Sequence, residues 1–183
     1  PSLKMGGIER ASSILANAFA VSGNNVSYIA VFPQEHFFEL SPNINLIEPS
    51  QGHNSNKLHL IRTLFWLRKK TKIISPDNVL VFNYFYGALV CLSLAKSGIP
   101  VFVSDRSSPI FKWSPHVNFF NKIIFSIIPP TGLVAQTEAA AEKQRNFFKK
   151  RVRIKVIPNA LREVRLYANT KRQKKVLGVG RLK

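Results

Sequence analysis

Short strand-like runs alternate along this chain with segments of helical periodicity, and that order is the strongest constraint on its fold. Three of the runs, VLVF, VFVS and GLVAQ, are apolar at successive positions, which is typical of strands covered on both faces. Strands joined by helices in this way predict a doubly wound α/β domain, a parallel sheet with helices on both faces and right-handed crossovers. The predicted strands are residues 26–32, 44–47, 79–83, 100–104, 132–136 and 152–157.

Five helices are predicted between these strands. The first begins after Gly6 and Gly7, and its apolar residues recur every three or four positions. Proline and glycine end the third and fourth helices, and Thr137 is the expected N-cap of the fifth. The patterns cover residues 8–19, 58–70, 88–96, 119–127 and 137–148.

Both ends of the chain indicate a larger protein. A doubly wound domain usually has a strand before its first glycine-rich turn, whereas residues 1–5 lead directly into Gly6 and Gly7. We therefore expect the first strand to lie upstream. The expected organisation is a domain over residues 1–165, a basic linker over residues 166–175, and the first strand of a second, truncated domain over residues 176–183.

The charge of the chain is unusual for its size. The 183 residues carry a formal net charge of +18, and from residue 143 onward there are 15 basic residues and 1 acidic residue. A patch this basic indicates an anionic partner, such as nucleic acid, an acidic membrane face or an acidic domain of the same protein. A merely solvated face is the alternative.

Cysteine and histidine usage argues against a metal site. The single cysteine, Cys91, excludes an internal disulfide and favours a reducing compartment. The four histidines have no partner at HxxxH or CxxC spacing, so we expect no structural metal. Residues 117–128 are apolar but too short for a membrane span and contain Lys122, so they form either a core helix or an interfacial one, and the pattern favours core.

Polar residues follow four of the predicted strands. Ligands of open α/β sheets bind outside the carboxyl ends of the strands, so these residues predict a site for a polar or phosphorylated ligand. Each of them could also be only a cap or a turn residue. Gly6 and Gly7, before a helix, form a further candidate anion site, although a tight turn is the simpler interpretation of a glycine pair. The residues after the strands are Asn83, Tyr84, Asp105, Arg106, Gln136, Thr137 and Asn159.

Five motifs, taken in order, resemble glycosyltransferase family 4. Their combination is more specific than any one of them. The resemblance implies a GT-B architecture, in which two Rossmann-like domains face each other across a cleft. The N-terminal domain then holds mainly the acceptor, and the C-terminal domain holds the nucleotide-sugar donor. The motifs are SLKMGGIER at residues 2–10, SDRSSP at 104–109, VAQTE at 134–138, VIPNA at 156–160 and GVGRL at 178–182.

The resemblance also implies a reaction: transfer of a sugar from a nucleotide-diphosphate sugar, with retention, without a metal and without a cofactor other than this donor. Gly6, Gly7 and Arg181 would bind the donor diphosphate. The implied acceptor is a glycan, a lipid-linked molecule or a polysaccharide; the sugar, the catalytic residues and the oligomeric state stay open. The acceptor-side residues would be Arg10, Asn83, Tyr84, Asp105, Arg106, Gln136, Thr137 and Asn159.

Two further expectations follow from the resemblance. The lysine and the carboxylate pair of the family's donor domain would lie beyond Lys183, so this stretch alone is expected to be inactive. The enzyme is expected in the cytoplasm, and its basic residues favour a peripheral position on the inner membrane face. The alternative is a basic α/β module that binds nucleic acid or an anionic membrane without catalysis. Nucleic acid is the less favoured partner, because the aromatic residues fall mostly in core-like runs.

Overall fold

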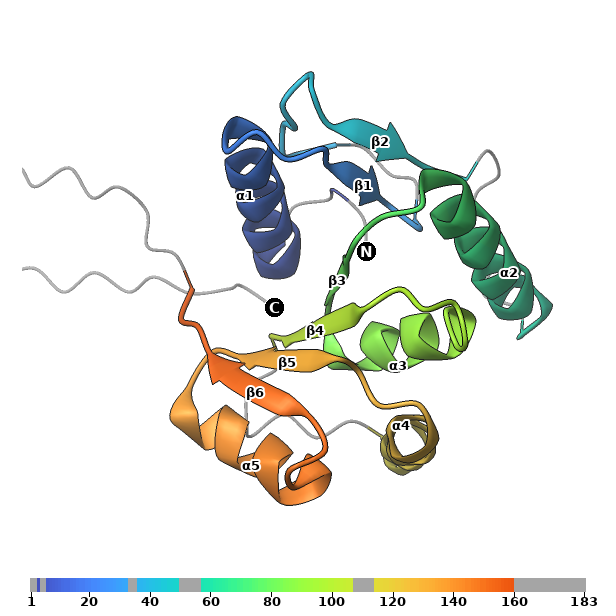
Figure 1. Cartoon of the computed structure of the whole chain (residues 1–183), viewed down its shortest axis with the longest axis vertical. Coiled ribbons are helices and arrows are strands. Elements are labelled where there is room, and N and C mark those ends of the chain that lie inside the picture. The colour runs from blue at the N-terminus through green and yellow to red at the C-terminus, as the bar shows by residue number, and fades with distance from the viewer. Residues whose placement is uncertain (1–2, 4–5, 33–35, 50–56, 107–113, 160–183) are drawn as a thin grey trace, which may run out of the picture.

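The computed structural model describes residues 3, 6–32, 36–49, 57–106 and 114–159, and only the backbone of residues 57–59. Helices and strands alternate through these ranges, as predicted from the sequence (Figure 1). The predicted linker and the strand of a second domain lie outside them. In chain order the elements are α1 (Gly7–Val21), β1 (Ser27–Ile29), β2 (Asn45–Ile47), α2 (Lys57–Ile74), β3 (Val79–Phe82), α3 (Tyr84–Ser93), β4 (Val101–Asp105), α4 (Pro115–Ile127), β5 (Gly132–Ala135), α5 (Glu138–Phe148) and β6 (Arg153–Val156).

Among the described residues all the strand pairs are parallel, which confirms the predicted parallel architecture, but the strands form two sheets. One sheet contains β1 and β2; the other has the order β3-β4-β5-β6. Within the described residues β1 and β3 are not paired with each other, so each of these two strands has one edge without a strand partner. This division of the sheet was not predicted.

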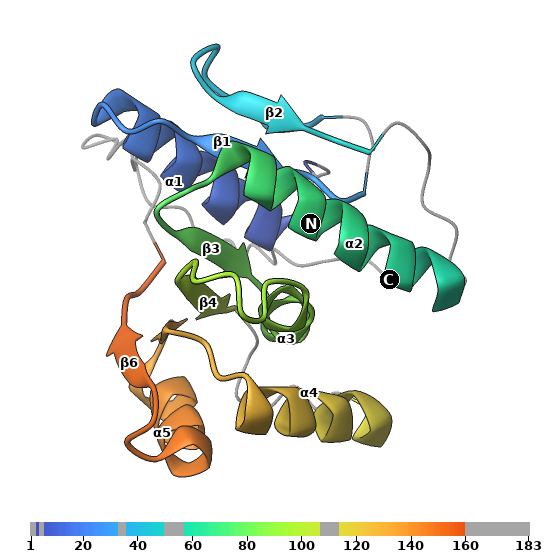
Figure 2. The same cartoon turned by 45° about the vertical axis from the view of Figure 1, so that its right-hand side comes forward.

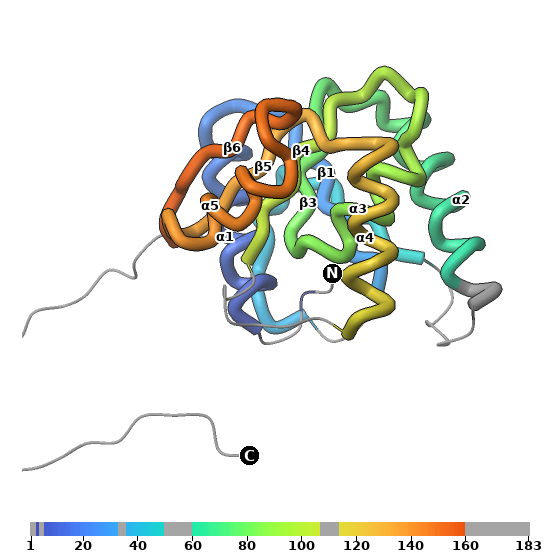
Figure 3. The backbone as a smooth tube through the Cα atoms, turned by 90° about the horizontal axis from the view of Figure 1, so that it is seen from below, coloured from blue at the N-terminus to red at the C-terminus, as the bar shows by residue number. Residues whose placement is uncertain are grey.

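Helices flank the sheets on different sides. The α3 and α5 helices pack on the four-stranded sheet, α4 lies beside α3, and α1 lies on the other side of that sheet (Figure 1). Figure 2 shows α2, α3 and α4 in a row, and the view from below in Figure 3 again places α3 next to α4. The Rossmann-like α/β class is therefore confirmed.

The main core lies between the four-stranded sheet and the helices α3, α4 and α5. Val81, Val103 and Leu133 are in register across three strands and are buried. Phe125 of α4 is fully buried against this layer. The α3 helix approaches the sheet closely because residue 87 is glycine: a Cβ there would lie 2.6 Å from Cγ1 of Val103.

A second, smaller core joins α1 to the two-stranded sheet. It contains Leu3, Ala16, Tyr28, Ala30 and Ile44. Ser12 of α1 contacts the Tyr28 hydroxyl through a buried hydrogen bond of 2.7 Å. Each sheet therefore has its own hydrophobic core.

Several element bounds and the cover of one strand differ from the sequence prediction. For example, β1 contains only Ser27–Ile29, and α2 extends to Ile74. The third helix begins at Tyr84 and ends at Ser93, not over residues 88–96, because the Asn83 side chain caps its first turn. The run VLVF is not covered on both faces, since the Leu80 side chain is 38% exposed. That exposure reflects the thinner cover on the sheet face opposite α3 and α5.

Candidate functional site

The polar side chains at the end of β4 point to opposite faces of the sheet. Side chains alternate along a strand, so Asp105 points to one face while Ser104 and Arg106 share the other. Asp105 faces α5, and its Oδ2 accepts a hydrogen bond of 2.8 Å from Nε2 of Gln144. Arg106 instead donates from Nε to Oγ of Ser104, at 3.0 Å. At the end of β4, one face of the sheet is thus covered by α5, and the other carries the Arg106 guanidinium.

Three predicted site residues meet at the carboxyl ends of β4, β5 and β6. The Oδ1 atom of Asn159 accepts a hydrogen bond of 2.8 Å from Nε2 of Gln136 and another from Nη1 of Arg106. The three residues are up to 53 positions apart in the sequence, and the parallel sheet alone brings them together. We call this group the rim cluster: Arg106, Gln136 and Asn159.

The Arg106 guanidinium is held in place from several directions. Its Cζ lies 5.2 Å from the centroid of the Phe82 ring, a cation–π distance. Partial burial lowers the pKa of Arg106, but arginine keeps its charge because its ordinary pKa lies far above neutrality. The cluster therefore presents a fixed positive charge beside two side-chain amides.

Asp105 and Tyr84 lie in the packed layer between the four-stranded sheet and its helices. Asp105 is 6% exposed, and the Tyr84 ring packs on Phe125 with centroids 4.9 Å apart. Burial, and to a lesser extent the nearby Asp105 carboxylate, raises the pKa of the Tyr84 hydroxyl, so this hydroxyl stays protonated.

Asn83 occupies an unusual backbone conformation at the end of β3. Its φ of 92° and ψ of 132° lie in a region that favours glycine. Its Oδ1 accepts a hydrogen bond of 2.9 Å from the Phe85 amide, and its own amide donates to the Ser104 carbonyl. The side-chain cap offsets the backbone strain and fixes the start of α3 next to β4.

This geometry gives a paired stability test. We expect Asn83→Ala to lower the free energy of unfolding by about 1–2 kcal/mol, because alanine loses the cap and keeps the strain. Asn83→Gly also loses the cap but relieves the strain, so it should stay within about 0.5 kcal/mol of the wild type. Urea unfolding followed by circular dichroism measures both. Equal losses in the two variants would contradict the strained backbone at this residue.

Thr137 and Arg10 lie apart from the rim cluster. The Thr137 Oγ1 accepts a hydrogen bond of 3.2 Å from the Ala140 amide, which confirms the predicted N-cap of α5. Arg10 lies in α1, where its carbonyl accepts a hydrogen bond from the Ser13 hydroxyl. Among the described residues, Arg10 makes no hydrogen bond to the rim cluster. The structure therefore gives Thr137 a structural role and leaves Arg10 as a sequence-based prediction.

Gly6 and Gly7 lie at the start of α1, with Gly6 as the N-cap in extended conformation. The Glu9 carboxylate folds back to this end: a Cβ on Gly6 would overlap Oε2 of Glu9. An acidic group at a helix N-terminus is stabilised by the helix dipole. An incoming phosphate at Gly6 would therefore have to displace the Glu9 side chain. Arg181, the other predicted donor-side residue, lies outside the described residues.

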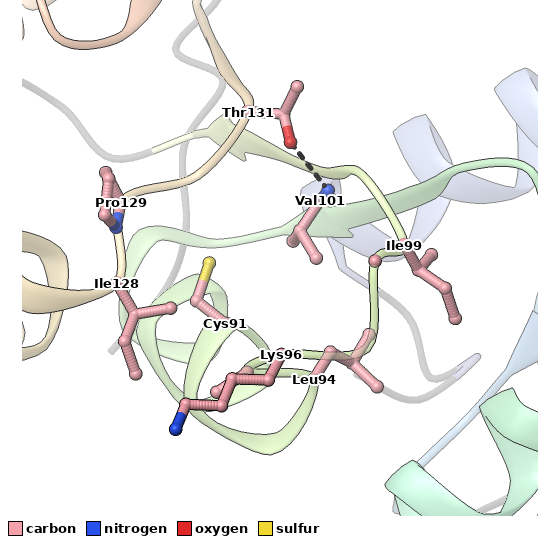
Figure 4. A pocket seen from close by; sticks show the side chains of 10 residues that line it. Cys91, Leu94, Lys96, Ile99, Val101, Ile128, Pro129 and Thr131 are labelled. Atoms are coloured by element: carbon pink, nitrogen blue, oxygen red, sulfur yellow. Dashed lines mark hydrogen bonds between the residues drawn. The ribbon is translucent and has the colours of Figure 1, made fainter.

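A small pocket of about 170 Å³ lies beside Val101, the first residue of β4 (Figure 4), whereas the rim cluster lies at the carboxyl end of that strand. The pocket is lined by Val101, Thr131, Ile128 and Cys91. Burial raises the pKa of the Cys91 thiol to about 12, so the thiolate needed of a nucleophile is scarce at neutral pH. Cys91 is a residue of the main core, and the pocket is separate from the candidate site.

Sequence reasoning missed two supporting residues. Phe82 lies under the Arg106 guanidinium, but in the sequence it looked only like a core residue of a strand. Gln144 holds Asp105, and a weak signal did exist: it is a polar residue among the buried positions Ala140, Ala141 and Phe148 of α5. A buried polar side chain on an apolar helix face needs a partner, which points to a polar group on the sheet.

Two findings limit what the described residues can do. Within the described ranges, no group of three or more His, Cys, Asp or Glu side chains is placed to hold a metal ion. None of the described helices is both long and apolar enough to cross a membrane.

The sequence profile described as Glycosyltransferase Family 4 matches residues 5–163, and no curated protein matches the chain.

Proposed function

The chain belongs to glycosyltransferase family 4, and from this premise we propose that it is the acceptor-binding lobe of a retaining glycosyltransferase. The matched range extends from before Gly6 to beyond Asn159 and so includes the rim cluster. The donor is a nucleotide-diphosphate sugar, and the acceptor is a glycan, a lipid-linked molecule or a polysaccharide. The reaction uses no metal and no cofactor other than the donor.

The rim cluster is the observation that supports an acceptor role most strongly. Sugars offer hydroxyl groups, which side-chain amides such as those of Gln136 and Asn159 bind as donors and as acceptors. The guanidinium of Arg106 has five N–H groups, of which two are used on Ser104 and Asn159 among the described residues. The others suit a phosphate of a lipid-linked acceptor or a sugar hydroxyl.

The proposal also includes a second lobe, which binds the donor. Residues 1–165 bind the acceptor, residues 166–175 form a linker, and residues 176–183 begin a donor-binding domain. Gly6 and Gly7 on one side and Arg181 on the other bind the donor diphosphate, which displaces the Glu9 side chain from the start of α1. Negative charge develops on the leaving diphosphate during transfer, and fixed N–H groups and arginine stabilise such charge electrostatically.

Binding and turnover can be separated experimentally. We expect the chain 1–183 to bind a lipid-linked diphosphate acceptor analogue, measured by saturation-transfer NMR, and to give no turnover with radiolabelled nucleotide-diphosphate sugars. The same chain extended by its donor domain should transfer the label with retention, read from the anomeric NMR signal of the product. Turnover by 1–183 alone at rates typical of enzymes would contradict the division into two lobes.

A further inference from the structure

Four aromatic side chains form a continuous row that joins the end of the two-stranded sheet to helices α3 and α4. Phe32 follows β1 at the start of the row. Phe85 and Tyr86 lie in the first turn of α3, and Phe120 lies in α4. The ring centroids of successive members are 5.9, 5.4 and 6.4 Å apart. We call this group the aromatic row; in spatial order it is Phe32, Tyr86, Phe85 and Phe120.

The aromatic row lies outside the buried part of both hydrophobic cores. None of its four members is among the buried residues of either core. Phe32, Phe85 and Tyr86 are half-buried, and Phe120 is 36% exposed. Rings that are already held by their neighbours lose little conformational entropy when a ligand binds to them. The row is therefore an ordered aromatic surface that a ligand can reach.

Hydrogen-bonding groups lie close to the row. Burial, and to a lesser extent the Glu9 carboxylate of α1, raises the pKa of the Tyr86 hydroxyl, so this hydroxyl stays protonated and can donate a hydrogen bond. Phe82 ends β3 three residues before Phe85, and its ring contacts the Arg106 guanidinium of the rim cluster. Since the carboxyl ends of parallel strands meet at one edge of a sheet, the aromatic row and the rim cluster share that edge.

We propose that the aromatic row binds the C–H face of a pyranose ring of the acceptor. A pyranose has C–H groups on its faces and hydroxyl groups around its edge. Aromatic rings remove the C–H face from water, while polar groups at the same edge of the sheet, the rim cluster among them, bind the hydroxyls. The inference rests on the proposed function and narrows the acceptor to a molecule that offers a sugar ring.

Other ligands fit the row less well. The hydrocarbon chain of a lipid would cover the Tyr86 hydroxyl and approach the Glu9 carboxylate, and both groups would lose water without gaining a hydrogen bond. A planar nucleobase stacks best between parallel rings, whereas neighbouring rings of the row are tilted by 50–60° to each other. The puckered chair of a pyranose has no single plane and can contact rings of different tilt.

Saturation-transfer difference NMR on the chain 1–183 tests the proposal. The probes are the methyl β-glycosides of glucose, galactose, mannose and N-acetylglucosamine. At least one of them should bind, with the strongest saturation on the C–H protons of one ring face. Glucitol has the hydroxyl groups of glucose but no ring, and it should bind about 10-fold more weakly than the bound glycoside or not at all.

Leucine variants separate the aromatic rings from apolar bulk. Phe85→Leu and Phe120→Leu each keep an apolar side chain and remove a ring, so each should weaken binding of the glycoside about 3- to 10-fold. Phe119→Leu is the matched control, since Phe119 is on the same helix as Phe120 but outside the row, and it should bind like the wild type. Phe120 is at the surface, so its variant keeps the test decisive if Phe85→Leu has altered circular dichroism.

Two results would overturn the aromatic row as a sugar site: wild-type affinity in the leucine variants, or no binding of any of the four glycosides. Failure of the proposed function gives a different result. Sugar transfer by the two-lobed enzyme with an unchanged kcat/KM in Phe120→Leu would keep the proposed function and overturn the row. Glycoside binding that depends on Phe120, without sugar transfer by the two-lobed enzyme, would keep the row and overturn the proposed function.

Discussion

Replacing Phe125 by alanine is expected to lower the free energy of unfolding by about 3–5 kcal/mol. The side chain is fully buried and joins three elements of the main core. Its ring lies 4.9 Å from the Tyr84 ring of α3 and 5.6 Å from the Phe148 ring of α5, centroid to centroid. Alanine would leave a cavity between these helices, and the rings around it cannot all move in to fill it.

A neighbour on the same helix provides the control for this prediction. Phe119 is 67% exposed, so Phe119→Ala should change the free energy of unfolding by less than about 0.5 kcal/mol. Chemical denaturation followed by circular dichroism compares the two variants under the same conditions. A loss below about 1 kcal/mol for Phe125→Ala would mean that α4 does not pack on the sheet as described.

Replacing Arg106 by alanine is expected to lower kcat/KM for sugar transfer by about 30- to 100-fold in the two-lobed enzyme. The change removes the cation of the rim cluster and leaves Asn159 without one of its two donors. Arg106→Lys keeps a positive charge but lacks the planar fork that reaches both Ser104 and Asn159. We therefore expect lysine to recover only part of the activity.

Arg145 is the matched control for Arg106. It is an exposed arginine of α5 whose Nη1 lies 2.8 Å from Oε2 of Glu138, and exposed ion pairs contribute little. Arg145→Ala should leave kcat/KM within a factor of about two of the wild type. Steady-state assays at varied acceptor concentration, with thermal unfolding in parallel, distinguish a binding defect from a folding defect. Similar kcat/KM values for the two alanine variants would mean that Arg106 is not part of the acceptor site.

Helix α4 shows one limit of prediction from the sequence. Residues 117–128 were predicted as a helix, yet the sequence could not decide which of its apolar residues face the core. Packing against α3 buries Ile124 and Phe125, and leaves Ile123 and Ile127 outside. Helical periodicity fixes the relative positions of side chains around the axis, but the side that meets the sheet depends on the neighbouring elements.

The rim cluster shows a similar limit. The sequence shows that polar residues follow the strands, because a change from apolar to polar residues marks each strand end. From the sequence alone, Arg106, Asp105 and Thr137 are equivalent candidates for the site. The structure separates them, since side-chain alternation turns Asp105 toward Gln144 and the helix start uses Thr137 as its cap.

Local signals in the sequence determined the order of strands and helices, their parallel arrangement and the family, because hydrophobic periodicity, caps and motifs act over neighbouring residues. Only the tertiary structure decided the division into two sheets between β1 and β3, and the meeting of Arg106 with Asn159. Both depend on which strands pair and in what register. Pairing is a contact between residues far apart in the chain, and no local pattern specifies its partner.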